Sequence, residues 1–263
     1  MKIDRKKVLD EFKAYTDGYD PEDPKIALKI EHTYFVADNC ERIAESEGFS
    51  EEDIDLAWLS GMLHDIGRFE QAKRYNSFSD AKTVDHAEFG ADLLFGRDAL
   101  IGKFTDDRSC DEMLETVIRQ HNKYRIDSKV TGKTKKFCDI LRDADKVDII
   151  RVNVEMPMEE IYNLPMETLL SSGVSKKVMD EVREHRTIRR DLMSTSADHL
   201  IGHIALTFEL VYPESLKIVK EQGFLEKTFD FPSNNESTIN ALKETKEELQ
   251  KWASIDLFSP PKR

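Results

Sequence analysis

Helical patterns recur along all 263 residues of the chain, and they constrain its fold more than any other feature. Apolar residues return at three- and four-residue intervals, whereas alternating runs of β-branched and aromatic residues are almost absent. The first pattern is typical of amphipathic helices and the second of strands. We therefore predict an all-α fold, a helical bundle with additional C-terminal helices.

Capping signals place the first helix boundaries. Asp23 and Pro24 have the residue types of an N-cap and of the first helical position, so we expect a helix from there to about Ser46. The run Ser-Glu-Glu-Asp at 50–53 resembles a capping box and predicts a second helix. Gly67 is expected to mark the end of that second helix.

A polar stretch from Lys73 to Asp85 predicts a loop over the entrance to a site, and a helix is expected over 85–95. An N-terminal helix and lead-in are expected over 1–25. The last residues, 259–263, are expected to fray. Further helices are predicted over 110–122, 134–151, 158–171, 176–188, 197–210 and 236–252, with breaks at Gly132, Pro157, Gly173 and near Pro213 and Pro232.

Composition argues against several classes of function. The formal net charge of −13 opposes attraction to a phosphate backbone, so we expect no polymeric nucleic-acid partner. A small phosphorylated substrate is compatible with this charge, because a metal and a few cations can reverse the field within one pocket. Three cysteines without a CxxC spacing indicate neither a disulfide framework nor a thiolate zinc site.

The hydropathy of the chain favours a cytoplasmic protein without a membrane partner. No apolar run approaches the ~20 residues that cross a bilayer, and no signal-peptide h-region follows the basic start. The length fits one ordinary domain or a domain with an appendage. The sequence leaves the oligomeric state open.

Histidine is scarce in the chain, but four of the seven lie in helical segments of the first half: His32, His64, His86 and His121. Carboxylates accompany them, since Asp65 follows His64 directly and three more share one helix: Asp143, Asp145 and Asp148. Buried imidazoles and carboxylates are costly unless they are paired or bound to a metal. A shared cation would satisfy several of them together, so the pattern favours a metal site over a satisfied polar core.

The neighbours His64 and Asp65 constrain the geometry of such a site. Adjacent helical residues diverge by roughly 100°, so both side chains can face one ion only near a helix end, which Gly67 would supply. A carboxylate at that end can give one oxygen to each of two cations. Asp65 is therefore expected to bridge two metal positions.

The first ion would be held by His32, His64 and a carboxylate of the 143–148 group. The second would be held by His86 and His121, unless these two bind phosphate or stabilise a single-metal site. Mixed imidazole and carboxylate ligands suit Mn, Fe, Co, Ni or Zn better than Mg. We expect one or two divalent transition-metal ions, with iron or manganese favoured.

The order His, His-Asp, Asp resembles the HD superfamily of metal-dependent phosphohydrolases. It stands here at His32, His64-Asp65 and Asp145, and the resemblance selects Asp145 over Asp143 and Asp148. Four phrases resemble a bacterial subgroup with two extra histidines, whose relatives can hold a binuclear centre: HDIGRFEQ at 64–71, DHAEFGADLL at 85–94, HN at 121–122 and LRDADKVDIIR at 141–151. The resemblance covers about residues 26–151 and extends toward 223.

The resemblance also implies a domain division and an activity. Residues 26–151 would form the domain core, with the helices of 152–263 packed on the same body. The metal would activate a water to attack phosphorus in a phosphomonoester or phosphodiester, since coordination brings the pKa of bound water to about 7. The substrate would be a small phosphorylated compound, with nucleotides and dinucleotides among the candidates.

Two cations complete the expected catalytic set with Asp65. Arg68 matches a position where relatives often carry Lys or Arg near the phosphate, and its planar fork suits bidentate contact. Its alternative role is an ion pair with Glu70 or another surface acid, and exposed pairs of that kind contribute little. Lys146, beside Asp145, is the second cation candidate.

Two other functions compete with the hydrolase. Some relatives of this fold use a similar six-residue set to hold two irons that activate oxygen, and a non-catalytic metal- or nucleotide-binding regulator could keep the same ligands. His199 and His203 lie on one helix face without an HExxH pattern, so we interpret them as a pocket wall or packing contact. His185 and its neighbouring arginines are interpreted as a solvated face.

Overall fold

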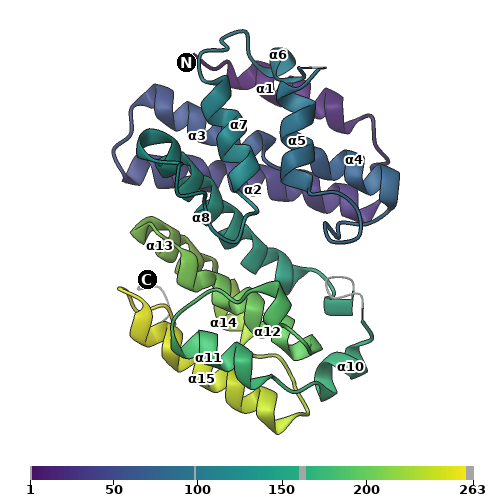
Figure 1. Cartoon of the computed structure of the whole chain (residues 1–263), viewed down its shortest axis with the longest axis vertical. Coiled ribbons are helices and arrows are strands. Elements are labelled where there is room, and N and C mark those ends of the chain that lie inside the picture. The colour runs from purple at the N-terminus through teal and green to yellow at the C-terminus, as the bar shows by residue number, and fades with distance from the viewer. Residues whose placement is uncertain (1, 98, 160–163, 259–263) are drawn as a thin grey trace. The chain divides into compact units, whose positions relative to one another are not determined.

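The computed structural model describes residues 2–97, 99–159 and 164–258. Over these residues the chain is helical and contains no β-strand, so the predicted all-α fold is confirmed (Figure 1). The chain divides into two compact units, Met1–Asp145 and Lys146–Arg263. The division falls inside helix α8 (Gly132–Glu155). That the C-terminal helices pack on the same body as the domain core stays a prediction.

The first unit is built around α2 (Pro24–Ser46) and α3 (Glu51–Leu63), which pack along each other. A Cβ at Gly61 would lie 2.6 Å from the Cα of Ala37, so the missing side chain allows the two helices to approach closely. Leu59 and Leu63 of α3 are fully buried. This close packing brings the C-terminal end of α3 beside the middle of α2, where His32 lies.

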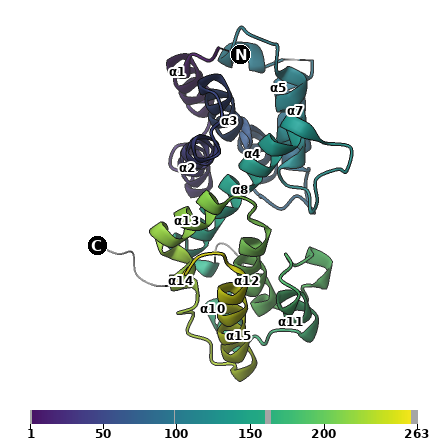
Figure 2. The same ribbon diagram turned by 90° about the vertical axis from the view of Figure 1, so that its left-hand side faces the viewer.

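Five further helices and the start of α8 complete the first unit. The five are α1 (Arg5–Thr16), α4 (Ile66–Tyr75), α5 (His86–Phe95), the short α6 (Ile101–Phe104) and α7 (Asp111–Gln120). Helix α5 packs against both α4 and α7, and α5 and α7 lie side by side in two perpendicular views (Figure 1, Figure 2). The core between them includes Phe69, Leu94 and Ile118, all fully buried.

Several predicted boundaries are confirmed in the first unit. Asp23 caps α2 through the N–H of Lys25, with Pro24 at the first helical position. Ser50 caps α3 through the N–H of Asp53. The loop predicted from Lys73 covers residues 76–85 instead, because α4 continues to Tyr75.

The prediction for Gly67 was wrong. Helix α3 already ends at Leu63, and Gly67 lies in the first turn of α4. A Cβ there would lie 2.5 Å from the carbonyl oxygen of His86 and 2.7 Å from the backbone nitrogen of Gly90. Gly67 therefore allows the backbones of α4 and α5 to cross closely, rather than ending a helix.

The second unit begins with the end of α8 and contains α10 (Met166–Ser171), α11 (Lys176–Arg183), α12 (Ser196–Ala205), α13 (Pro213–Gln222), α14 (Phe224–Thr228) and α15 (Glu236–Trp252). Two short 3-10 segments, Arg190–Leu192 and Leu206–Glu209, flank α12. Residues 160–163 of the predicted helix 158–171, and the tail 259–263, lie outside the described residues.

Two predicted breaks coincide with helix starts. The chain leaves the helical conformation between Glu209 and Pro213, as predicted, and Pro213 is the first residue of α13, where proline's missing N–H costs nothing; α13 itself was not predicted. Gly132 likewise lies at the predicted break between α7 and α8, where it is the first residue of α8 and adopts a φ of 59°. In both cases a residue that interrupts a helix interior stands at a helix start.

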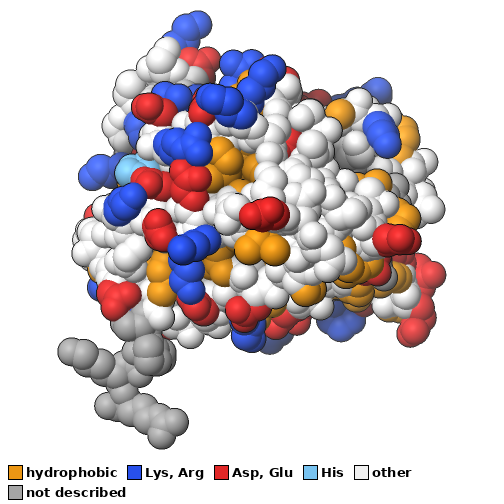
Figure 3. Space-filling view, turned by 90° about the horizontal axis from the view of Figure 1, so that it is seen from below, with side chains coloured by type: hydrophobic (Ala, Val, Ile, Leu, Met, Phe, Trp, Pro, Cys, Tyr) orange, Lys and Arg blue, Asp and Glu red, His pale blue; other side chains and the backbone are white. Residues whose placement is uncertain are grey.

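Several exposed arginines of the second unit form ion pairs. The arginines near His185 are exposed, and Arg183 contacts Glu244 at 2.6 Å while Arg186 contacts Glu181 at 2.9 Å. On the face in Figure 3, lysine and arginine side chains are interspersed with aspartate and glutamate. The interpretation of these arginines as a solvated face agrees with this arrangement.

Within the part of the chain that the structure describes, no helix combines the length and the apolar character that a bilayer crossing requires.

Candidate metal centre

Six helices bring polar residues of the first unit to one place. His32 comes from the middle of α2 and Asp145 from α8, whereas the remaining residues stand at helix ends. His64 is the C-cap of α3 and Asp65 the N-cap of α4, so the chain turns between them. This turn lets two adjacent side chains face one centre, as expected from their spacing. His86 opens α5, and His121 is the C-cap of α7.

The first group consists of His32, His64, Asp65 and Asp145. The Nε2 atom of His32 lies 3.3 Å from Nε2 of His64, 3.6 Å from Oδ2 of Asp65 and 3.2 Å from Oδ1 of Asp145. The Nε2 atom of His64 lies 3.5 Å from the same Asp65 oxygen and 3.8 Å from the same Asp145 oxygen. His32, His64 and Asp65 are buried, and the Asp145 side chain is 15% exposed.

These separations fit a shared ion. Two ligand atoms that each lie about 2.1 Å from one metal, at angles of about 90–110°, are about 3.0–3.4 Å apart. The distances of 3.2–3.8 Å in the first group are close to that range. Small movements of these side chains would complete a coordination sphere.

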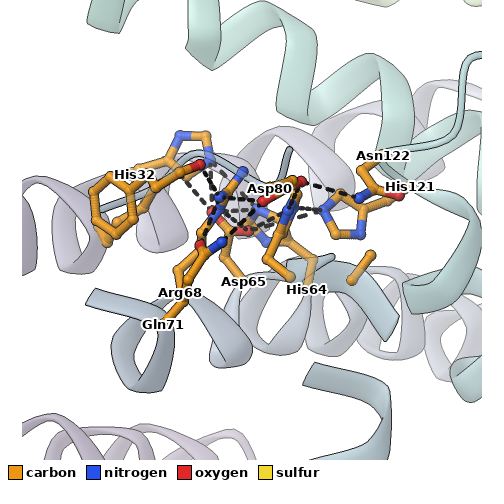
Figure 4. Close-up of polar contacts among 12 residues, drawn as sticks. His32, His64, Asp65, Arg68, Gln71, Asp80, His121 and Asn122 are labelled. Atoms are coloured by element: carbon orange, nitrogen blue, oxygen red, sulfur yellow. Dashed lines mark hydrogen bonds and ion pairs between the residues drawn. The ribbon is translucent and has the colours of Figure 1, made fainter. Parts of the chain in front are cut away.

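The second group shares Asp65 with the first. The Nε2 atoms of His86 and His121 are 2.9 Å apart, and they lie 3.4 Å and 3.8 Å from Oδ1 of Asp65. The two Asp65 oxygens thus face different groups, Oδ2 the first and Oδ1 the second. Figure 4 shows His32 on one side of Asp65 and His121 on the other. Asp65 therefore has the placement of a bridging carboxylate.

Hydrogen bonds at Nδ1 set the orientation of three imidazoles. His64 donates from Nδ1 to the carbonyl oxygen of Gly61 at 2.7 Å, and His121 donates to that of Ile118 at 2.7 Å. His86 donates from Nδ1 to Oδ2 of Asp80 at 2.6 Å. A neutral imidazole that donates at Nδ1 carries a lone pair at Nε2, which is the form that binds a metal.

The Nε2 atoms of His86 and His121 are arranged as if a cation lay between them. With Nδ1 protonated in both rings, the Nε2 lone pairs of His86 and His121 face each other across 2.9 Å. Two lone pairs at that distance repel each other, and both rings are buried. A cation that accepts both lone pairs removes this repulsion, so the donor set fits a bound metal.

The pKa shifts keep the groups in their ligand forms. Burial raises the pKa of Asp65, but Lys29 and then His64 outweigh burial and hold it well below its usual range. Burial likewise opposes the lowering of the Asp145 pKa, which the hydrogen bond and charge of His32 bring about. Burial, with His86 next, lowers the pKa of His121 to about 3. Metal ligands must be deprotonated, and at neutral pH these groups are.

Two cations lie against the shared carboxylate. Lys29 donates from Nζ to Oδ2 of Asp65 at 2.6 Å, and its side chain is 17% exposed. Nε of Arg68 lies 3.7 Å from Oδ1 of Asp65 and is a buried donor without a hydrogen-bond partner. Arg68 is anchored elsewhere, since its Nη1 donates to Oδ1 of Asp80 at 2.8 Å. Of the alternative ion pairs, the one with Glu70 is not the one formed, because Glu70 contacts Arg74; the acid that pairs with Arg68 is Asp80, whose side chain is largely buried.

Other predicted residues make contacts of their own. The buried Lys146 belongs to the second unit, where its Nζ is 3.6 Å from Oε2 of Glu209. Asp148 forms an ion pair with Arg151 at 2.6 Å, whereas Asp145 lies against His32 and His64. His199 is exposed on α12. All groups of three or more potential ligand atoms found among the described residues belong to the first unit.

Sequence reasoning missed four residues around the centre: Lys29, Gln71, Asp80 and Asn122. Lys29 lies one helical turn before His32, so its spacing on α2 was a usable signal. Asp80 lies in the loop, and nothing in its local sequence distinguishes it from nearby polar residues. Only the folded loop brings it to His86.

Comparison with known families agrees with this geometry. Residues 30–150 match the family model described as HD domain. This match lies within the range 26–151 expected from the motifs, and the predicted resemblance is confirmed. The chain therefore contains an HD domain, the domain of a superfamily of metal-dependent phosphohydrolases whose members bind divalent metals. Neither curated proteins nor solved structures gave a match.

Proposed function

We propose that this protein is a metal-dependent phosphohydrolase that uses two divalent ions to hydrolyse a small phosphorylated compound. The observation that carries the proposal is the placement of Asp65. Its Oδ2 lies within 3.6 Å of His32 and His64, and its Oδ1 lies 3.4 Å from His86 and 3.8 Å from His121. A carboxylate with different imidazoles at its two oxygens is suited to bridge two ions.

Ligand roles follow from the two groups. His32, His64 and Asp145 would hold one ion, His86 and His121 the other, and Asp65 both. When bound, the metal lowers the pKa of water and polarises the phosphoryl group. The mixed imidazole and carboxylate donors favour iron or manganese, with Co, Ni and Zn as further candidates.

The charge of the centre supports an anionic substrate. Asp65 and Asp145 are ionised and contribute two negative charges, whereas neutral imidazoles contribute none. Two divalent ions would carry four positive charges, which leaves a net charge of about +2 after the two carboxylates are neutralised. A phosphomonoester carries about −1.5 to −2 at neutral pH and would balance that net charge. Lys29 adds a cation at Asp65, so an anion is favoured over a neutral substrate.

Arg68 is the proposed phosphate-orienting residue. Its Nη1 is anchored by Gln71, Asp80 and the carbonyl oxygen of Phe78, which fixes the guanidinium plane. Its buried Nε–H remains without a partner on the side of Asp65 Oδ1. A buried donor without a partner is costly, and a phosphoryl oxygen would satisfy it. Lys146 remains a second proposed cation for the substrate.

The test is a substrate panel with defined metals. Metal-free protein is loaded with Mn²⁺, Fe²⁺, Co²⁺ or Ni²⁺ and incubated without oxygen with nucleotides, dinucleotides and sugar phosphates, and phosphate or nucleotide release is measured. We expect release that EDTA abolishes and that Asp65→Asn lacks. Two bound ions without release from any compound would contradict the proposal. Oxygen consumption dependent on an organic substrate would instead indicate a di-iron oxygenase, and nucleotide binding without product a regulator.

A further inference from the structure

Asp80 occupies a singular position in loop 76–85, because its two oxygens contact different parts of the centre. Oδ2 accepts the Nδ1–H of His86 at 2.6 Å, and Oδ1 accepts from Nη1 of Arg68 at 2.8 Å. Gln71 donates to the same Oδ1 at 3.1 Å. The Asp80 side chain is 15% exposed. One carboxylate thus contacts both an expected ligand of the second ion and the expected phosphate-orienting cation.

We propose that Asp80 is a positioning residue that holds His86 in its metal-binding tautomer and couples the second metal position to Arg68 and loop 76–85. The inference rests on the proposed function, because it concerns the second ion of that centre. A carboxylate that accepts the Nδ1–H of a ligand histidine fixes the ring and raises its basicity, and loss of such a partner typically weakens metal affinity about 10–100-fold.

Arg68 and Gln71, which both contact Asp80, also bind the backbone of loop 76–85. Arg68 donates to the carbonyl oxygen of Phe78 at 2.7 Å, and Gln71 donates to that of Val84 at 2.9 Å. Both residues lie on α4, one turn apart. Loop 76–85 is thus fastened near both of its ends by two side chains that also contact Asp80.

A separate cation site at Asp80, Asp85 and His86 is the competing interpretation, because their oxygen and nitrogen atoms lie close together. The contacts of Asp85 oppose it. Asp85 accepts from Asn122 at 2.8 Å, from Lys123 at 2.8 Å and from the backbone N–H of Ala87 at 3.0 Å. These donors satisfy Asp85 without an ion. The short contact between Asp80 and His86 is therefore a hydrogen bond that serves the neighbouring centre.

The variant Asp80→Asn tests whether Asp80 fixes the tautomer of His86. An amide has one accepting oxygen, whereas Asp80 must accept from Arg68 and Gln71 on one side and from His86 on the other. If the amide oxygen faces Arg68, the amide NH₂ faces Nδ1 of His86 and favours the tautomer protonated at Nε2. That tautomer cannot bind a metal through Nε2. The opposite amide orientation sets NH₂ against two donors.

The experiment is an anaerobic titration with Co²⁺ alone, followed by visible absorption and by ions counted per chain after equilibrium dialysis. We expect wild type to bind two ions. In Asp80→Asn we expect the first binding constant to stay within about twofold and the second to fall about 10–100-fold. The control Asp85→Asn removes the same charge from the same loop without touching Nδ1 of His86, and both constants should stay within about twofold.

The outcomes distinguish the two proposals. Wild type that binds fewer than two ions contradicts the binuclear centre and the inference with it. Wild type that binds two ions, with unchanged constants in Asp80→Asn, overturns the inference and leaves the proposed function intact. The inference would also be overturned if the second binding constant fell equally far in Asp85→Asn, because general damage to the loop would then explain the loss.

A measurement on wild type covers the case in which Asp80→Asn does not fold. Coupling between two sites is reciprocal, so occupation of the second position must stabilise the loop if the loop stabilises that position. Hydrogen–deuterium exchange of amides in residues 77–84 should slow with the second equivalent of Co²⁺ and change less with the first. Exchange unaffected by the second equivalent would contradict the inference.

Discussion

Two buried carboxylates, Asp65 in the first unit and Asp198 in the second, are satisfied in different ways. Asp198 is fully buried and accepts the backbone N–H groups of Ser175 at 2.7 Å, Ser194 at 2.8 Å and Thr195 at 3.0 Å. Asp65 is also buried, yet its hydrogen-bond donor is Lys29, and imidazole Nε2 atoms surround it. The backbone satisfies Asp198, whereas Asp65 is arranged for cations.

This difference indicates which buried polar groups serve structure and which serve chemistry. Asp198 closes a capping box with Thr195 at the start of α12, a role complete within the protein. Around Asp65, by contrast, the Nε2 lone pairs of His86 and His121 are directed at each other. Buried polar atoms without a partner in the protein indicate a bound ligand or ion. Substitutions at the two aspartates should therefore have opposite consequences.

The largest expected effect is that of Asp65→Asn on activity. The amide keeps the volume of the side chain but cannot bridge two ions, so both positions should lose affinity. We expect phosphate release to fall by about three orders of magnitude, since a metal contributes several kcal/mol of transition-state stabilisation and each 1.4 kcal/mol is about tenfold. Steady-state kinetics and metal analysis measure both effects. Unchanged metal content would contradict the bridging role.

The second prediction concerns Asp198→Ala, which should destabilise the second unit without affecting metal content. Removing the carboxylate leaves the part-buried N–H groups of Ser175, Ser194 and Thr195 without their acceptor, and each lost hydrogen bond costs about 1 kcal/mol. We expect a loss of roughly 3 kcal/mol in urea unfolding. A variant of unchanged stability that loses metal would reverse the assignment of the two aspartates.

The third prediction concerns metal removal by EDTA. Ligand at about 100 times its dissociation constant stabilises a fold by about 2.7 kcal/mol, which corresponds to a melting shift of roughly 5–10 °C for a unit of this size. Because the ligand groups lie in the first unit, hydrogen exchange should quicken there and stay constant over residues 176–252. Equal acceleration in both units would contradict a centre confined to the first.

The smallest expected effect is the pH dependence contributed by His203 in the second unit. Burial, followed by His199, lowers its pKa to about 4 from an ordinary value near 6.5. The unfolded chain therefore binds this proton at higher pH than the folded one, and stability is lost as pH falls from about 6.5 to 4. His203→Asn should flatten the dependence of unfolding free energy in this window. An equal slope in the variant would assign the effect to other groups.

Much of the fold follows from local signals in the sequence. The caps at Asp23 and Ser50 and the histidine order predicted α2, α3 and the candidate ligands, because capping and helical periodicity are local properties. Gly67 was misinterpreted as a helix end, and the helix that begins at Pro213 was not predicted. Whether glycine ends a helix or lets two helices cross depends on a partner helix far along the chain. Whether proline interrupts a helix or begins one depends on the exact register of the boundary.

The grouping of the candidate ligands was predictable from the sequence, whereas the residues around them were not. His32, His64, Asp65, His86 and His121 stand in helical segments with few alternatives, and the structure brings them together. Asp80 and Lys29 are single members of abundant residue types on a highly charged chain. Their contacts with His86 and Asp65 depend on the fold of the loop and the crossing of α2, which one sequence does not encode locally.

The most direct test of the central claim is anomalous X-ray diffraction from crystals of the protein loaded with Mn²⁺. Two anomalous peaks are expected on either side of Asp65, one among His32, His64 and Asp145 and the other between His86 and His121. Each peak should lie about 2.0–2.2 Å from its ligand atoms. Full Mn²⁺ loading with no peak beside Asp65, or with peaks only at surface carboxylates, would contradict the account.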